Sequence, residues 1–275
     1  MKSLHSYRCR AAAACARHAR LVLFCGLPGL APLATAAPIA WELNTNTTID
    51  VVNVATNASG PFGTTPFLSD SLAISPAAKL YSADGSGNLW DVTGPPIPVG
   101  PTGRTQIGDL DYASNGLWGY SNASQELFFF DFGSLGVTYS QVIALPPNAV
   151  VTGVAYQPSS GDIFLSANNG LNSDALLRVP AFATSATLVG GMTIGDAFSY
   201  ISDIDFDAAG NLIAMTFFHR YFYTVSPTTA ATTFISAGPH RDTTGLALSP
   251  VPEPGSWEML LAGAMLVGWR VRREG

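Results

Sequence analysis

One short pattern of apolar and small or polar residues occurs five times between residues 71 and 248 of the 275-residue chain. Each copy is four residues long and is typical of a buried β-strand. The copies are Ser71–Ile74, Asp109–Tyr112, Gly153–Tyr156, Asp203–Phe206 and Gly245–Leu248. Measured between their third residues, successive copies are 38, 44, 50 and 42 residues apart. A period of about 40–50 residues is typical of the blades of a β-propeller.

Each of the first four copies is followed by a turn rich in Pro, Ser, Ala, Asn or Gly and then by a second β-rich stretch, as in a tight hairpin. The second stretches are Lys79–Ser82, Gly116–Tyr120, Asp162–Leu165 and Asn211–Met215. The third stretches are Asn88–Val92, Glu126–Asp131, Ala175–Val179 and Arg220–Val225. A weaker fourth one is visible in Thr232–Ser236. The repeating unit is therefore predicted to be an antiparallel sheet of about four strands.

The fifth copy lacks the strands that should follow it, because the chain changes character after residue 250. Ile39–Leu43 and Thr48–Val54, which precede the first full repeat, match second and third strands. Joining both ends in one sheet would close the ring and remove open sheet edges. We therefore predict an all-β, five-bladed β-propeller over residues 37–250. A six-bladed ring, with one more blade in the long 156–204 interval, and an immunoglobulin-like sandwich are the alternatives.

The N-terminal residues follow a different pattern. A basic stretch ends at Arg20, an apolar run extends from Leu21 to Leu33, and Ala34-Thr35-Ala36 follows. This order is typical of a secretory signal peptide, so we expect residues 1–36 to be removed by cleavage after Ala36. A permanent N-terminal anchor is the alternative, but the apolar run is short and contains two prolines. All three cysteines lie in this segment, so the mature chain is predicted to have no disulfide and no thiolate metal site.

The segment 251–275 consists of three zones in order. Val251-Pro252-Glu253-Pro254 is a stiff break, and residues 257–269 are mostly apolar with Trp at both ends. A basic cluster follows, formed by Arg270, Arg272 and Arg273. As a helix the apolar span would be about 20 Å long, which is short for a bilayer core of about 30 Å. We predict a short transmembrane segment with its arginines on the cytoplasmic side, which places the body outside the inner membrane.

This tail resembles the PEP-CTERM sorting signal in its Pro-Glu-Pro tripeptide, its short Leu/Gly/Ala-rich span and its arginine cluster. The resemblance implies recognition by an exosortase, a polytopic, protease-like inner-membrane enzyme of Gram-negative bacteria that make exopolysaccharide or biofilm matrix. It also implies a precursor that is anchored in the inner membrane only transiently, before it reaches the cell surface or extracellular matrix. Glu258, a charge early in the span, departs from the pattern. An ordinary single-pass tail anchor is the alternative.

The charge of the chain narrows the choice of partners. Residues 37–250 contain sixteen Asp and Glu against five Lys and Arg, a formal charge of −11, whereas the whole chain carries −6. An acidic surface repels nucleic acid and anionic lipid, so nucleic acid is not predicted as a partner. The expected function is that of an exported, non-catalytic component of the cell surface or exopolysaccharide matrix, with exosortase and exopolysaccharide as partners.

Two pairs of acidic residues are the main candidates for a chemical site. Asp109 and Asp111 lie two residues apart in one predicted inner strand, and Asp203 and Asp205 do so in another. Residues i and i+2 of a strand share a face, so the pairs could bind calcium at a channel mouth. The simpler interpretation is that they accept hydrogen bonds from backbone N–H groups between blades, and we expect no cofactor. A calcium-dependent hydrolase or lactonase-like enzyme and a protein-binding platform are the alternative functions.

Three further patterns receive structural interpretations. The segment Asp84–Asn88 resembles only the front half of a calcium loop and is predicted to be a hairpin turn. His219 and His240, the only histidines outside the leader, are expected in polar loops. Several aromatic residues are predicted to pack between blades, or to stack on sugars if they prove exposed on one rim. They are Trp41, Trp90, Trp118, Tyr120 and Phe128–Phe130.

Overall fold

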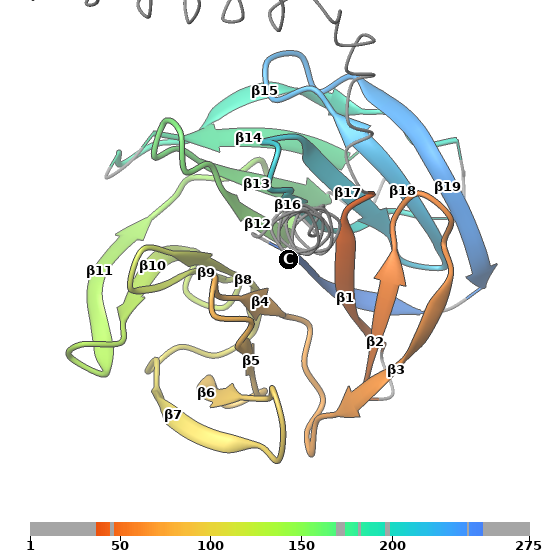
Figure 1. The fold of residues 1–275 in the computed structure, drawn as a ribbon. Coiled ribbons are helices and arrows are strands. Elements are labelled where there is room, and N and C mark those ends of the chain that lie inside the picture. Colours follow the sequence, from red (N-terminus) through yellow and green to blue (C-terminus); the bar gives the residue numbers. More distant parts are fainter. Residues whose placement is uncertain are drawn as a thin grey trace, which may run out of the picture. The chain divides into compact units, whose positions relative to one another are not determined.

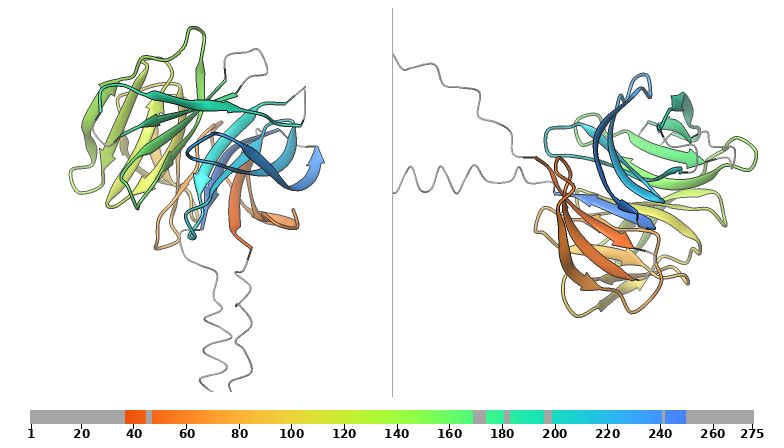
Figure 2. Two further views of the ribbon diagram at one scale, coloured as in Figure 1. Left: turned by 90° about the horizontal axis from the view of Figure 1, so that it is seen from above. Right: turned by 90° about the vertical axis from the view of Figure 1, so that its right-hand side faces the viewer.

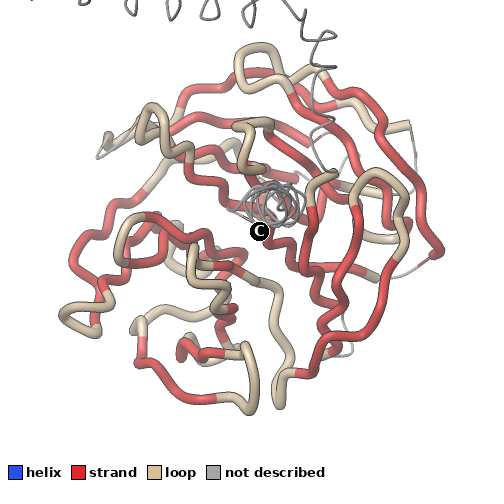
Figure 3. Tube along the Cα trace, viewed as in Figure 1, coloured by secondary structure: helices blue, strands red, loops and turns tan. Residues whose placement is uncertain are grey.

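The computed structural model describes residues 37–44, 47–168, 174–180, 183–195, 199–240 and 242–249. These residues form twenty strands in five antiparallel sheets of four, and Figure 3 shows them as strands joined by loops. No helix in this part of the chain is long and apolar enough to span a membrane. The predicted signal peptide (1–36), sorting signal (251–275) and membrane span (257–269) lie outside the described residues.

The five sheets are arranged as blades in a ring (Figure 1). Blade 1 contains β1 (Ile39–Asn44), β2 (Thr48–Asn53), β3 (Ser59–Thr64) and β20 (Thr243–Leu248). Blade 2 contains β4 (Ala73–Ile74), β5 (Leu80–Ala83), β6 (Asn88–Asp91) and β7 (Ile97–Pro101). Blade 3 contains β8 (Ile107–Ala113), β9 (Gly116–Ser121), β10 (Glu126–Asp131) and β11 (Gly136–Val142). Blade 4 contains β12 (Val150–Tyr156), β13 (Ile163–Asn168), β14 (Asp174–Val179) and β15 (Thr187–Met192). Blade 5 contains β16 (Ile201–Phe206), β17 (Leu212–Thr216), β18 (His219–Val225) and β19 (Thr232–His240).

Blade 1 closes the ring with strands from both ends of the described chain. β20 pairs antiparallel with β1, and Trp41 lies opposite Ala247 in this pairing. Figure 2 shows the two strands side by side from two further directions. The structure therefore confirms the predicted five-bladed propeller and its closure, and the long 156–204 interval contains β13–β15 of blade 4 rather than an extra blade.

The innermost strand of every blade is the four-residue pattern found in the sequence. These strands, β4, β8, β12, β16 and β20, contact one another around the axis of the ring. Buried apolar side chains form five clusters, and each cluster lies between two neighbouring blades. The apolar core is thus divided into blade-to-blade layers, and burial of apolar surface holds each blade to the next.

The predicted aromatic residues belong to these layers. Tyr120 and the ring of Phe128 are fully buried, and Trp118 contacts Phe129 with ring centroids 5.1 Å apart. Trp41 and Trp90 are partly buried against the cluster between blades 1 and 2. This confirms that these aromatic residues pack between blades.

Candidate functional site

The four predicted aspartates all lie on inner strands near the axis of the ring. Asp109 and Asp111 of β8 reach to blade 4, where their Oδ2 atoms accept hydrogen bonds from the N–H groups of Val154 (2.7 Å) and Tyr156 (2.5 Å). Asp203 and Asp205 of β16 reach to blade 1 in the same way and accept from Leu246 (2.5 Å) and Leu248 (2.6 Å). Each pair thus fastens its blade to the next one.

Small residues occupy crowded positions of the receiving strands. β12 has glycine and alanine at the positions where β8 has its two aspartates, and β20 repeats this arrangement opposite β16. A Cβ atom on Gly153 would lie 2.6 Å from the Ile204 nitrogen and 2.9 Å from Oδ1 of Asp203. A side chain at Gly153 would therefore collide with Asp203 and with the backbone of the neighbouring strand β16.

Most of the remaining carboxylate oxygens are also occupied. Oδ1 of Asp111, Asp203 and Asp205 each accepts the N–H of the following residue. Among the described residues, Oδ1 of Asp109 has no N–H or hydroxyl donor. The carboxyl groups of Asp109 and Asp203 are within hydrogen-bonding reach of each other, so this pair can share a proton.

Burial changes the titration of these groups. It is the main cause that raises the pKa of Asp111 to about 7, against which two backbone hydrogen bonds act. Burial first, and repulsion from neighbouring aspartates second, hold the pKa values of Asp203 and Asp205 well above the usual range, and burial does the same for Asp109. Burial and the mutual repulsion of like charges therefore disfavour simultaneous ionisation of the four carboxyl groups.

The contacts of the aspartates agree with the simpler of their two interpretations. Seven of the eight carboxylate oxygens accept backbone N–H groups. Within the described chain, no group of three or more acidic, histidine or cysteine side chains is placed to hold a metal ion. A calcium ion at the axis would have to displace hydrogen bonds that join the blades.

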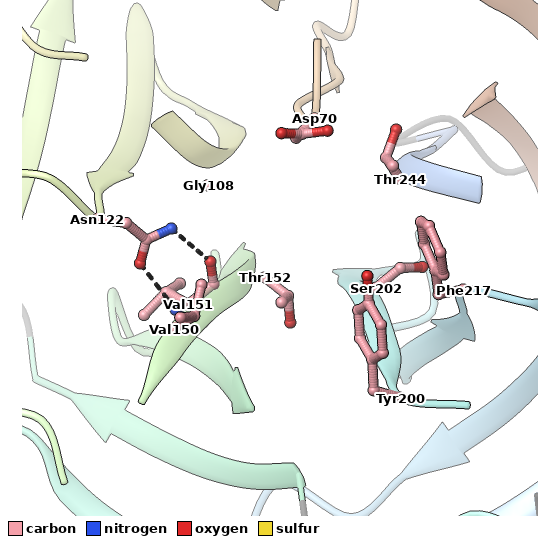
Figure 4. Close-up of a pocket in the computed structure, with 10 residues that line it drawn as sticks. All are labelled: Asp70, Gly108, Asn122, Val150, Val151, Thr152, Tyr200, Ser202, Phe217 and Thr244. Atoms are coloured by element: carbon pink, nitrogen blue, oxygen red, sulfur yellow. Dashed lines mark hydrogen bonds between the residues drawn. The ribbon is translucent and has the colours of Figure 1, made fainter. Parts of the chain in front are cut away.

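A pocket of about 320 Å³ opens where the inner strands begin (Figure 4). Every blade contributes one residue to it from the same position of the repeat, directly before the four-residue pattern. These five residues are Asp70, Gly108, Thr152, Ser202 and Thr244. Asn122, Val150, Val151, Tyr200 and Phe217 complete the lining.

β-Bulges place four of these residues in the pocket. The registers of β8, β12 and β16 each skip one residue, which is Gly108, Thr152 or Ser202. The pairing of β20 with β1 skips Thr244 in the same way. Bulges redirect side chains and occur often beside functional sites. The repeat therefore builds one pocket from five equivalent positions.

Some polar groups that line the pocket form hydrogen bonds within the protein. Asn122 exchanges two hydrogen bonds of 2.9 Å with the backbone of Val151, as the dashed lines in Figure 4 show. The Thr152 hydroxyl donates to the carbonyl of Ile201 at 2.7 Å, and the Ser202 hydroxyl donates to that of Met215 at 3.2 Å. These groups position the walls of the pocket.

Other groups that line the pocket have no hydrogen bond, or only long ones, within the described residues. Among the described residues, neither the Asp70 carboxylate nor the Tyr200 hydroxyl has a hydrogen-bond partner, and the Thr244 hydroxyl has only long contacts of 3.3 and 3.4 Å. Partial desolvation raises the pKa of Asp70. Burial, and then the charges of Asp70, Asp174 and Asp242, raise the pKa of Tyr200 to about 12.

An aromatic group forms one side of the pocket. The rings of Tyr200 and Phe217 are stacked with centroids 5.0 Å apart, and Phe218 meets Phe217 edge-on at 4.8 Å. Phe218 is 37% exposed. The pocket therefore combines an acidic group, the Tyr200 hydroxyl and aromatic rings.

The Asp84–Asn88 segment and the two histidines lie in hairpins and strands of the propeller. Asp84 caps the predicted hairpin turn by accepting the N–H groups of Ser86 and Asn88, and the chain continues as β6. The expectation of polar loops for the histidines is wrong for the backbone, because His219 begins β18 and His240 ends β19, opposite each other in the register.

Two features were not identified from the sequence. The pocket was missed because its residues come from separate repeats, and the bulges that bring them together leave no distinct pattern in the sequence. Arg220, predicted only as part of a strand, is fully buried and forms an ion pair of 2.6 Å with the buried Glu42 across the junction of blades 5 and 1.

Comparison with known proteins identifies the tail and supports the fold. A family model of the PEP-CTERM protein-sorting motif matches residues 250–273. A chain in the crystal structure of a nidogen/laminin complex is similar with a TM-score of 0.55 and 10% sequence identity, over 77% of this chain and 98% of that one. Hydrazine synthase of Kuenenia stuttgartiensis is similar with a TM-score of 0.46 and 12% identity, over 62% of this chain and 49% of that one. No curated protein sequence matches the chain.

The chain therefore carries a PEP-CTERM sorting motif, as the sequence predicted. The motif implies export, processing by an exosortase and sorting to the surface in a Gram-negative bacterium. The nidogen/laminin likeness concerns the fold alone, because the sequence identity is low.

Proposed function

We propose that this protein is a non-catalytic component of the surface or exopolysaccharide matrix of a Gram-negative bacterium. One observation carries the proposal: a sorting motif at residues 250–273 directly follows a closed propeller domain. Exosortase is the processing partner in this proposal, and the tail serves as a transient membrane anchor. The propeller is then the part that remains outside the cell.

Two properties of the propeller support a role outside the cell. Strands from both ends pair in blade 1, so no blade of the ring is left incomplete. The body has no cysteine, so its stability does not depend on the redox state of its surroundings.

The contacts of the acidic residues support a non-catalytic role. The axial aspartates join blades through backbone N–H groups, which leaves them poorly placed to act as bases or nucleophiles. The pocket is lined by one acidic residue and one phenol, without a histidine, cysteine or lysine among the residues that line it. Such a lining suits binding better than group transfer.

Localisation in the native host tests the proposal. Antibodies against the propeller should detect most of the protein in the extracellular matrix fraction of wild-type cells and in the inner membrane of an exosortase deletion strain. Restoring exosortase from a plasmid should return the protein to the matrix. Equal amounts in the membranes of both strains would contradict the proposal.

A further inference from the structure

We propose that the axial pocket binds a glycan unit that carries a protonated amine, with Asp70 as its charge partner and Tyr200 and Thr244 as hydrogen-bonding partners. The inference rests on the proposed matrix role for its choice of a glycan. The occupant is an amino sugar in a polysaccharide chain, rather than a neutral or an acidic sugar.

The position of the pocket on the axis of the ring favours a binding site. Four equivalent β-bulges and the corresponding loop residue Asp70 place one residue of every blade around a single opening on the axis. The volume of about 320 Å³ is at the lower end of the range of ligand pockets, about 300–1,000 Å³. It suits a ligand of the size of one sugar ring, with the rest of a chain outside.

The carboxylate of Asp70 favours a ligand with a positive charge. The Asp70 side chain is exposed to solvent at the pocket and has no hydrogen bond or ion pair among the described residues. No lysine or arginine lines the pocket. A charge-assisted hydrogen bond from an ammonium group would stabilise the carboxylate, whereas a uronic acid would meet repulsion.

The aromatic rings and hydroxyl groups that line the pocket with Asp70 favour a sugar. Asp174 and Asp242 lie close enough to Tyr200 to influence its hydroxyl, so the negative potential extends beyond Asp70. The stacked Tyr200 and Phe217 supply an aromatic group at the same opening, and aromatic rings attract both ammonium groups and the C–H faces of sugars. The free Tyr200 hydroxyl and the weakly bonded Thr244 hydroxyl provide partners for sugar hydroxyls.

Calorimetric titration of the purified full chain in detergent tests the inference. The probes are tetramers of glucosamine, of N-acetylglucosamine and of glucose, which share a pyranose chain and differ in charge. The glucosamine tetramer should bind at least about tenfold more tightly than the other two, because only it donates a charge-assisted hydrogen bond. Its affinity should fall as salt is added, since the attraction is ionic.

Two variants localise the binding. Asp70→Asn keeps the shape of the side chain and should weaken the glucosamine tetramer by about tenfold or more. Asp131→Asn is the matched control, because it removes one carboxylate from the β10–β11 hairpin, outside the pocket lining, and should leave the affinity unchanged. Melting curves of both variants verify the fold, and the comparison of three probes on the unaltered chain does not depend on any variant.

Several outcomes would overturn the inference. Equal affinity for the three tetramers, no binding of the glucosamine tetramer, or unchanged binding by Asp70→Asn each contradict it. The measurement is independent of sorting. Binding without exosortase-dependent localisation would leave the pocket assigned and reject the matrix role, whereas correct localisation without binding would do the reverse.

Discussion

Asp109 and its three counterparts show how single residues shape the axis of this propeller. Each carboxyl group reaches across a blade junction to a backbone N–H, and Gly153 of β12 leaves space that Asp203 of β16 needs. The sequence could predict that these residues satisfy backbone donors. It could not predict that carboxyl groups from two blades come within reach of each other, because that depends on the narrowness of the ring.

The raised pKa values predict a dependence of stability on pH. The pKa of Asp111 is about 7 in the folded protein and near 3.8 in the unfolded chain, so the folded state binds more protons between these values. The free energy of unfolding should therefore be largest at acidic pH and fall as pH rises through about 7. We expect a melting temperature at least about 5 °C lower at pH 8 than at pH 5, since one kcal/mol corresponds to about 2–4 °C in a domain of this size.

Thermal melts of matched variants test whether Asp111 causes this dependence of stability on pH. Asp111→Asn, which keeps one acceptor oxygen and cannot ionise, should reduce the difference between pH 5 and pH 8. Asp131→Asn at the β10–β11 hairpin should preserve it. A melting temperature that is constant or higher at pH 8 in the unaltered protein would refute this explanation.

The steric role of the small axial residues leads to a second prediction. Gly153→Ala should lower the free energy of unfolding by about 1–3 kcal/mol or more, because the new methyl group would lie 2.6 Å from a backbone nitrogen. Gly94→Ala, where a Cβ atom meets nothing within 4 Å, is the control and should change it by about 0.5 kcal/mol at most. Urea unfolding measures both, and equal effects would show that the axis is not crowded.

The hydrogen bonds of the axial aspartates predict the response to calcium. A ligand that binds only the folded state raises the melting temperature. We expect no rise in millimolar calcium, because seven of the eight axial carboxylate oxygens accept backbone N–H groups. A clear calcium-dependent rise that Asp203→Asn abolishes would instead support the alternative of a calcium-dependent enzyme.

At the level of strands, much of the fold could be predicted from the sequence. The inner-strand pattern recurs because every blade buries the same face, and the turn residues mark each hairpin. The N-terminal strands can be identified from the sequence as the missing partners of Gly245–Leu248, because an open ring would expose sheet edges. The bulges could not be predicted, because a one-residue insertion in a register leaves no distinct pattern of apolar residues.

The junction of blades 5 and 1 depends on a buried polar network. Arg220 of β18 pairs with Glu42 of β1 at 2.6 Å and also donates to the side chain and the carbonyl of Asn57, at 2.5 and 2.9 Å. Its burial was not predicted, since a charged residue at a strand end is usually exposed. The pairing joins the last complete blade to the N-terminal strands, where the ring is closed.

Removal of this arginine should open the junction. We expect Arg220→Met to lower the free energy of unfolding by about 3–5 kcal/mol, because it breaks the buried ion pair with Glu42 and the hydrogen bonds to Asn57. A cycle with Glu42→Gln should show a coupling of at least about 1 kcal/mol. Lys79→Met, which breaks an exposed pair with Asp91, is the control and should have little effect. An Arg220→Met variant as stable as this control would contradict a structural role.

The chain combines a C-terminal sorting motif with a five-bladed propeller that has a pocket on its axis. The tail could be interpreted from sequence because its zones are contiguous and ordered. The pocket could not, because its five equivalent residues lie in five repeats and meet only when the ring closes. Its one free acid and the acidic charge of the body favour a cationic partner.

The central claim is that the chain is exported, cut by an exosortase and left outside the cell as a propeller. Intact mass and terminal peptides of the protein from its native host, with and without the exosortase gene, test it most directly. We predict a wild-type form that begins at Ala37 and ends near Pro254, and a deletion-strain form that retains Arg270, Arg272 and Arg273. Membrane-bound protein that keeps these arginines in both strains would contradict the claim.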